Sequence, residues 1–128
     1  MEFEIDRRIW DRATFEHISQ GKILTLDGKM CCLGFVSKQA GACENDMLEM
    51  SFPYEIFLYK RFDKKYIDTL NPAIKDFVLY DDSSFIGNSD FSNKASSIND
   101  NNKTTTQEKE FLLQNLFQKH GHNITFIN

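Results

Sequence analysis

Proline, glycine and cysteine are scarce in this chain of 128 residues, which has only 2, 6 and 3 of them. So little proline and glycine excludes collagen-like and proline-rich segments. No apolar run approaches the roughly 18 residues that a membrane-spanning helix needs. Three cysteines, two of them adjacent, make a poor disulfide framework, because adjacent cysteines bridge only through a strained ring. We therefore expect reduced thiols, no membrane partner, and a single compact domain over residues 1–128.

Positive charge is also limited, because 15 Lys and Arg stand against 19 Asp and Glu, a net charge of −4. There is no basic tail or stripe. Sequence-independent binding to DNA or RNA needs several cations near the phosphates, so we expect no direct contact with nucleic acid. The first residues are acidic before any apolar run, unlike a secretory signal, which favours a cytoplasmic location.

Aromatic residues are abundant instead, with 12 Phe, 4 Tyr and 1 Trp. They predict a Phe-rich core. Apolar residues that alternate with polar ones predict strands, and apolar residues at helical spacing predict helices. Thr105 followed by Glu108 forms a capping-box pattern at the start of the last helix. The strands are predicted at residues 3–6, 23–26 and 123–127, and the helices at 31–40, around 54–61, and from 105 to 120. The fold class is α+β (mixed): a small sheet with two packed helices.

A polar stretch separates the middle of the chain from its last helix. Of the 27 residues from 81 to 107, 18 are Ser, Thr, Asn or Asp. This composition predicts a long polar loop, pinned to the body by Phe85, Ile86 and Ile98. Long connections often carry function, so the loop is a candidate binding surface for a small polar ligand or a partner. The alternative is a loop that is only solvated.

Two blocks of sequence resemble a known group of proteins. Residues 27–35 read DGKMCCLGF, and residues 98–100 read IND, followed by a Glu-containing helix, Gly121 and a terminal apolar strand. Together they resemble the core and the C-terminal block of small uncharacterised proteins encoded by phages and prophages. Residues 44–97 do not contribute to the resemblance. It implies an accessory protein of a phage or mobile element in the cytoplasm of a bacterial host, and it carries over no catalytic residue.

Cys31 and Cys32 are the candidate nucleophiles. Both lie at the predicted start of a helix, where the dipole and free N–H groups stabilise a thiolate. His122, at the start of the terminal strand, is the candidate base, and Asn99 or Asp100 could orient it. The alternative is that both thiols are buried for packing and that Gly34 lets two backbones approach closely.

Metal binding and other catalytic chemistry are less well supported by the sequence. Cys43 and His120 would complete a zinc ligand set with the residues above, but no Cys-x-x-Cys pair is present, so we expect no metal and no cofactor. Phosphate-binding loops, Gly-x-Ser-x-Gly elbows and His-Glu-x-x-His pairs are missing as well. The classes of enzyme that need them are therefore disfavoured.

A nucleotide-like ligand would need cations and stacking surfaces. Arginine matches phosphate bidentately, and aromatic rings and side-chain amides complete such a site. The candidate ligand-binding residues are Arg7, Arg8, Arg12, Arg61, Phe85, Phe91, Asn99 and Asp100.

The leading prediction is an accessory protein that acts by stoichiometric binding. It would either inhibit a host defence protein or sequester a small nucleotide-like signal, and the sequence leaves both open. The alternative is a cysteine-dependent hydrolase or transferase that uses Cys31 or Cys32 with His122. Whether the chain forms a homo-oligomer also stays open.

Overall fold

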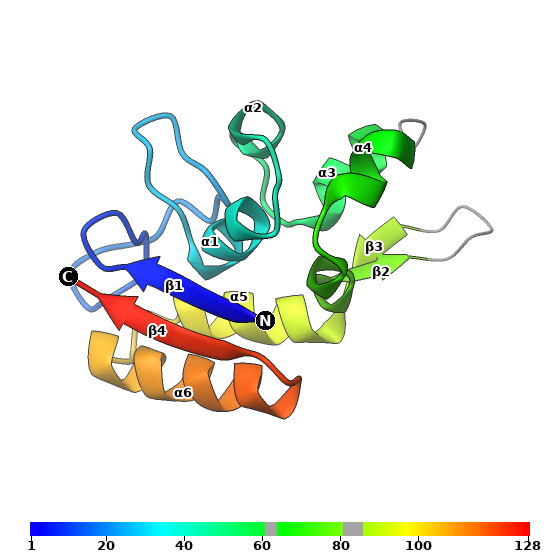
Figure 1. The fold of residues 1–128 in the computed structure, drawn as a ribbon. Helices are drawn as coiled ribbons and strands as arrows, with labels where there is room; N and C mark the ends of the chain where they lie inside the picture. Colours follow the sequence, from blue (N-terminus) through cyan, green and yellow to red (C-terminus); the bar gives the residue numbers. More distant parts are fainter. Residues whose placement is uncertain (61–63, 81–85) are drawn as a thin grey trace.

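The computed structural model describes residues 1–60, 64–80 and 86–128. The described chain has a mixed α+β fold with two small sheets (Figure 1). Its elements follow in the order β1 (Glu2–Asp6), α1 (Cys32–Gln39), α2 (Glu44–Met47), α3 (Tyr54–Lys60), α4 (Lys64–Thr69), the 3-10 helix η1 (Pro72–Phe77), β2 (Val78–Tyr80), β3 (Ile86–Asn88), α5 (Asp90–Asp100), α6 (Thr106–Lys119) and β4 (Asn123–Ile127).

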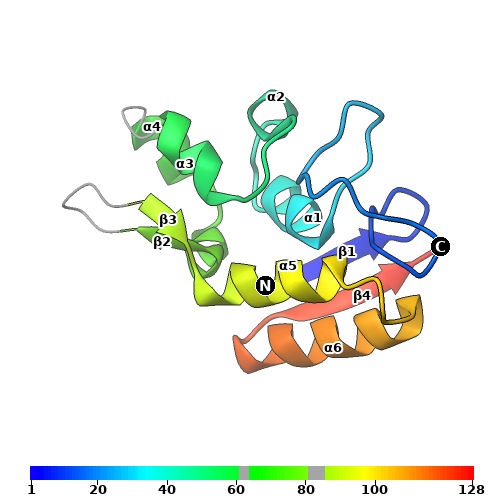
Figure 2. The ribbon, with the colours of Figure 1, turned by 180° about the vertical axis from the view of Figure 1, so that it is seen from behind.

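The two ends of the chain form the first sheet. β1 pairs in parallel with β4, and the register places Phe3 opposite Ile124 and Ile5 opposite Phe126. Alternation buries Phe3 and Ile5, while the charged residues between them stay exposed or half-buried. β2 and β3 form a separate antiparallel pair next to α3. In Figures 1 and 2 this pair lies away from the terminal sheet, beyond the end of α5.

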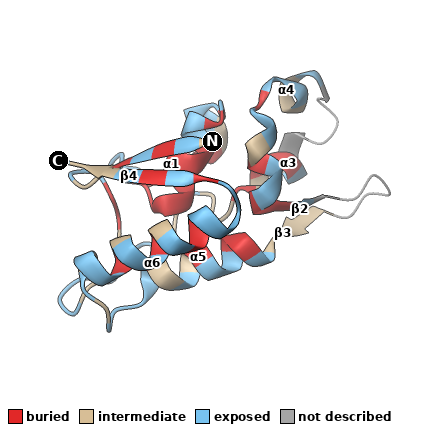
Figure 3. Ribbon diagram, turned by 60° about the horizontal axis from the view of Figure 1, so that its bottom comes forward, coloured by how far each residue is buried: buried red, intermediate tan, exposed pale blue. Residues whose placement is uncertain are grey.

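Three helices enclose the terminal sheet. α1 packs against β1, α6 packs against β4, and α5 contacts both α1 and α6. Figure 2 shows α5 and α6 side by side as a helical hairpin with the strands close to them. The core lies where these helices and the sheet meet, and Figure 3 shows buried residues concentrated on α1 and alternating with exposed ones along the strands.

Phenylalanines form the centre of the core, as the composition predicted. Phe3, Phe77, Phe91 and Phe117 come from four different elements, and each is at most 2% exposed. The ring centroids of Phe77 and Phe91 lie 4.4 Å apart, and those of Phe91 and Phe117 lie 4.9 Å apart in an edge-to-face arrangement. Such pairs add specific ring contacts to the burial of large apolar surfaces. This cluster holds α5, α6, η1 and β1 together.

Gly34 explains the close packing of α1. A Cβ atom at this position would overlap the carbonyl oxygen of Ile23 and lie 2.8 Å from the Cβ of Met30. Only glycine lets the helix approach the segment before it so closely. The prediction that Gly34 allows a close approach of two backbones is confirmed.

The strand edges are covered by side chains. The amide of Gln39 donates to the carbonyl oxygen of Glu4 at 2.6 Å and accepts from its N–H at 2.8 Å, as a neighbouring strand would. On β4, Gln114 donates to the carbonyl oxygen of Ile124 at 3.4 Å. Unpaired edges invite another strand to pair, and these amides occupy part of each edge.

The long polar loop predicted over 81–107 is wrong for residues 86–100, and residues 81–85 of it lie outside the described residues. Residues 90–100 form α5, and residues 86–88 form β3. The helix forms because Phe91, Ala95 and Asn99 recur every four residues and bury one face, while Ser89 accepts a hydrogen bond from Ser92 N–H as an N-cap. Tertiary burial outweighs the low intrinsic helix propensity of Ser, Asn and Asp.

The strand predicted at residues 23–26 is also wrong. This segment forms a single isolated bridge, between Leu24 and Leu48, because the chain that faces it is itself irregular. Residues 9–18 contain no helix, and Trp10 makes an isolated bridge with Met30.

Candidate functional site

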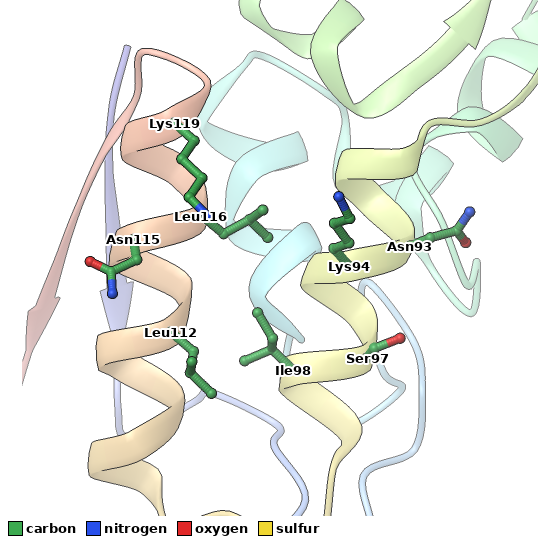
Figure 4. Close-up of a pocket in the computed structure, with 8 residues that line it drawn as sticks. All are labelled: Asn93, Lys94, Ser97, Ile98, Leu112, Asn115, Leu116 and Lys119. Atoms are coloured by element: carbon green, nitrogen blue, oxygen red, sulfur yellow. The ribbon is translucent and has the colours of Figure 1, made fainter.

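An open groove runs between α5 and α6 and has a volume of about 490 Å³ (Figure 4). That volume lies within the range of pockets that hold ligands in proteins. Apolar side chains form its floor, and amides, a hydroxyl and two ammonium groups form its rim. It is lined by Asn93, Lys94, Ser97, Ile98, Leu112, Asn115, Leu116 and Lys119.

The helical hairpin that forms the groove is fixed at its turn. Thr105 Oγ1 accepts a hydrogen bond from Glu108 N–H at 3.1 Å, which confirms the N-cap half of the predicted capping box, and the Thr105 hydroxyl donates to Oε1 of Glu108 at 3.2 Å. The ammonium group of Lys109, which is fully buried, donates to the carbonyl oxygen of Asn101 and to Thr104 in the connection between the helices. Burial lowers the pKa of Lys109. The two helices therefore hold a defined spacing at this end.

The side chains on the α6 side of α5 are Lys94 and Ile98. Phe91 and Phe117 meet edge to face in the core and close the interface between the two helices there. Figure 4 shows Lys94 and Ile98 of α5 on the side of Leu112 and Leu116, whereas Asn93 and Ser97 point to the other side of α5. The walls of the groove are therefore formed by one lysine and one isoleucine opposite two leucines.

The apolar surface is continuous with exposed residues of α6. Leu116 is 8% exposed and forms the floor, and Leu112 is 40% exposed at its edge. Phe111, the residue before Leu112, is 63% exposed but does not line the groove. Single exposed apolar residues are common, whereas an open groove with an apolar floor marks an interaction surface.

The rim of the groove carries positive charge. Of the described residues that line it, none is acidic, although the chain as a whole carries a net charge of −4. The only ion pair that a rim lysine makes within the described residues joins Lys94 to Asp90 at 3.0 Å, and both side chains are more than half exposed. Exposed pairs of this kind contribute little free energy, so Lys94 can exchange its partner.

None of the predicted catalytic or ligand-binding residues that the structure describes lines this groove. The sequence signal for it was the run of Phe111, Leu112 and Leu113, which puts apolar residues on more than one face of a helix. The other wall was hidden because Ile98 fell in the predicted loop.

Cys31 and Cys32 do lie at the start of a helix, as predicted, but burial governs their chemistry. Cys31 is the N-cap of α1 and is 6% exposed, and Cys32 is fully buried. Burial raises the pKa of Cys31 to about 12 and raises that of Cys32 well above its ordinary value. Desolvation thus outweighs the hydrogen bonds from backbone N–H groups of α1 that favour a thiolate at Cys31. Both thiols are packed in the core, as the alternative interpretation had it, and their burial favours the protonated form.

His122 forms its hydrogen bonds elsewhere. Its Nδ1 lies 3.1 Å from the amino group of Met1, and its Nε2 lies 2.7 Å from Oδ2 of Asp76. An ammonium group only donates, so Nδ1 of His122 accepts the hydrogen bond from Met1. Nε2 then donates its hydrogen bond to the carboxylate of Asp76. Its ring packs among Phe3 and Phe77. Within the described residues His122 therefore anchors β4 to η1 and makes no hydrogen bond to either cysteine.

The candidate arginines are engaged in internal contacts. Arg7 makes a two-pronged ion pair with Glu110, at 2.6 and 3.1 Å. Arg8 pairs with Asp6 at 2.8 Å, and its hydrogen bonds lower the pKa of Asp6 to about 2. Arg12 donates to Thr106 Oγ1 and to backbone carbonyl oxygens, and its guanidinium lies over the ring of Trp10. Burial lowers the pKa of Arg12.

The other candidate ligand-binding residues do not form a surface site. Phe91 is 2% exposed and belongs to the core. Asn99 is fully buried, and Asp100 at the end of α5 accepts hydrogen bonds from Ser19 and from the amide of Asn99. The expectation that these residues would bind a ligand therefore needs correction, because the segment that carries them is a helix with its inner face buried. Arg61 and Phe85 lie outside the described residues.

Among the described residues, no group of three or more His, Cys, Asp or Glu side chains could hold a metal ion. No helix in residues 1–60, 64–80 and 86–128 combines the length and apolar character needed to cross a membrane.

The chain matches no protein-family model, no curated protein and no solved structure.

Proposed function

We propose that the protein acts by stoichiometric binding of a partner protein through the groove between α5 and α6. The observation that carries the proposal is the apolar floor of Ile98, Leu112 and Leu116, which is open to solvent between two fixed helices. If the chain is an accessory protein of a phage, as the resemblance of residues 27–35 implies, its partner is a host protein, and a host defence protein that it inhibits is the leading choice.

The apolar surface beside the groove supplies binding free energy. Covering a fully exposed large apolar side chain stabilises a complex by about 1.5–3 kcal/mol. Leu112 is 40% exposed at the groove, so covering it would contribute about half of that. A few such residues dominate most protein interfaces, with the surrounding polar contacts serving to exclude water.

A protein segment fits this surface better than a nucleotide. Of the arginines that would hold phosphate, the described ones have internal partners: Arg7 pairs with Glu110, and Arg8 pairs with Asp6. The groove has an apolar floor and is open at its sides, whereas a site for a small molecule encloses most of the surface of its ligand. Sequestration of a nucleotide-like signal is accordingly the less favoured form of the proposal.

A photo-crosslinking amino acid placed at Asn115 tests the proposal in cells that express the chain. Asn115 is exposed and lines the groove. The matched control carries the same amino acid at Leu58, which is exposed on α3 and outside the groove. We expect one adduct from position 115 and none from position 58. The captured protein, once purified, should form a 1:1 complex by native mass spectrometry and leave it with unchanged mass.

Two results would overturn the proposal. One is an adduct from position 58 with none from position 115, which would move the interface to α3. The other is a partner that is cleaved or modified on contact with the protein, which would make the protein an enzyme.

A further inference from the structure

We infer that the segment bound in the groove is an amphipathic α-helix with acidic side chains at the end that lies over Lys94 and Lys119. This inference rests on the proposed function and names the chemistry of the partner. Three observations support it: the positive charge of the two lysines, their position at one end of an apolar groove, and the glutamine side chains that cover the edges of β1 and β4.

The two lysines lie at the same end of the groove. α5 and α6 run antiparallel, so the first turn of α5, which precedes Lys94, is beside the last turn of α6, which contains Lys119. Figure 4 shows one lysine on each wall at this end, with Leu112 and Ile98 toward the other end. The groove is therefore cationic at one end and apolar at the other.

Charge complementarity follows from this arrangement. Carboxylates over the lysine end would meet two opposite charges, at Lys119 directly and at Lys94 in exchange for its exposed partner Asp90, which does not line the groove. The negative end of a helix dipole at the same place would add to the attraction, which favours an orientation with the partner's C-terminal turn over the lysines. The surface thus selects an acidic partner although the chain itself is acidic.

A helix is the secondary structure that matches the walls. On α6 the lining residues recur as Leu112, Asn115, Leu116 and Lys119, a ridge at spacings of three and four into which another helix packs. From Leu112 to Lys119 the ridge is about 10 Å long at 1.5 Å per residue, or two helical turns. A strand would instead add to a sheet edge, and Gln39 and Gln114 already hydrogen-bond to the outer edges of β1 and β4.

A second copy of this chain is a poorer occupant. Through the same face it would offer two lysines, amides and a hydroxyl, but no carboxylate from the described lining residues. The carboxylate of an alkyl carboxylate would pair with the lysines, and its alkyl chain would cover the apolar floor, but Phe111 would stay exposed. Both remain outcomes of the test.

Three helical peptides that share one apolar stripe and differ only in the four residues of one end provide the probe. The end carries Glu, Gln or Lys, and binding to the full chain is followed by fluorescence anisotropy. Two exposed charge pairs give about a tenfold difference in affinity. We expect the Glu peptide to bind about tenfold more tightly than the Gln peptide, with the Lys peptide weakest, and the preference to shrink from about 0.05 M to about 0.5 M salt.

The variant with Lys94→Glu and Lys119→Glu should reverse the order of the peptides. The matched control, with Lys75→Glu and Lys103→Glu, makes the same change in net charge at exposed sites outside the groove and should keep the order. Equal binding of all three peptides, with each lost in Leu112→Glu, would overturn the acidic preference and leave the proposed function intact. The absence of binding by any of the peptides would overturn the helical ligand.

Competition and sedimentation separate the other occupants. Displacement of the Glu peptide by dodecanoate at micromolar concentration would make an alkyl carboxylate the ligand and overturn the inference. A wild-type dimer that becomes a monomer in Leu112→Glu would make the occupant a second copy, and would also overturn it. A monomer that binds the Glu peptide 1:1 supports it.

Discussion

The side-chain oxygen of Asn99 accepts a hydrogen bond from the indole nitrogen of Trp10 at 2.7 Å, in the interior of the protein. The same oxygen accepts from the backbone N–H of Cys32 at 3.1 Å, and the amide nitrogen donates to Asp11 and Asp100. Cys31, the N-cap of α1, makes no side-chain cap of its own. Asn99 therefore caps α1 from a different helix and joins the N-terminal loop to α5.

Replacing Asn99 with alanine should destabilise the protein strongly. The change leaves the indole N–H and the Cys32 N–H without their acceptor, and each buried unsatisfied donor costs about 1–3 kcal/mol. We expect a loss of about 2–5 kcal/mol in the free energy of unfolding, measured with urea. Asn115→Ala, at an exposed position of α6, is the control and should stay within about 0.5 kcal/mol of wild type. A stable Asn99→Ala protein would show that the network is not structural.

Gly34→Ala should prevent stable folding. Its Cβ would meet the carbonyl oxygen of Ile23, and backbone cannot move aside as a flexible side chain does. A loss of more than about 3 kcal/mol is expected, by overpacking. Gly121→Ala provides the comparison, because it has open space but φ of +80°, and should cost only about 1–2 kcal/mol. Circular dichroism melts of both variants decide the matter: similar melting temperatures would contradict the close packing.

Only one of the three thiols should react quickly in the folded protein. Cys43 is exposed, whereas Cys31 and Cys32 are buried, and their raised pKa keeps them protonated. Titration with an aromatic disulfide reagent should therefore give one fast equivalent in buffer and three in urea. Cys43→Ser should abolish the fast equivalent. Fast reaction of a second thiol would revive the hydrolase interpretation.

Stability should fall at alkaline pH because of Cys31. Its pKa rises from 9.0 to about 12 on folding, so the folded state holds a proton that the unfolded state releases. The contribution is fully present below pH 9 and is lost as pH rises toward 12, at up to about 1.4 kcal/mol per pH unit. Urea unfolding between pH 8 and about 11 should show a steeper decline for wild type than for Cys31→Ala. Equal slopes would contradict the burial of this thiol.

Local signals predicted much of the fold. The capping box at Thr105 and the strand at residues 123–127 appear in the structure where the sequence placed them, because each depends on neighbouring residues. The parallel pairing of β1 with β4 could not be predicted, since it joins the two ends of the chain. α5 was missed because its Ser, Asn and Asp content favours loops, and only burial of Phe91 and Ala95 against the core makes it a helix.

The candidate site was harder to predict because it depends on two helices at once. Leu112 and Leu116 lay in a predicted helix, but an apolar residue in one helix cannot show whether its face is covered. Cys31 and Asn99, which the sequence made candidates for a functional site, are buried in the core instead. A sequence does not distinguish a polar or reactive side chain that points to solvent from one that points into the core, so both are predicted as candidate functional residues.

Calorimetric titration of the purified partner into matched leucine variants tests the central claim most directly. Leu112 in the groove and Leu58 on α3 are each 40% exposed, so their changes to glutamate should cost similar stability. The groove predicts a 1:1 complex with wild type, an unchanged affinity for Leu58→Glu, and an affinity at least about tenfold weaker for Leu112→Glu. Equal binding by wild type and Leu112→Glu would contradict the claim that the groove between α5 and α6 is the binding site.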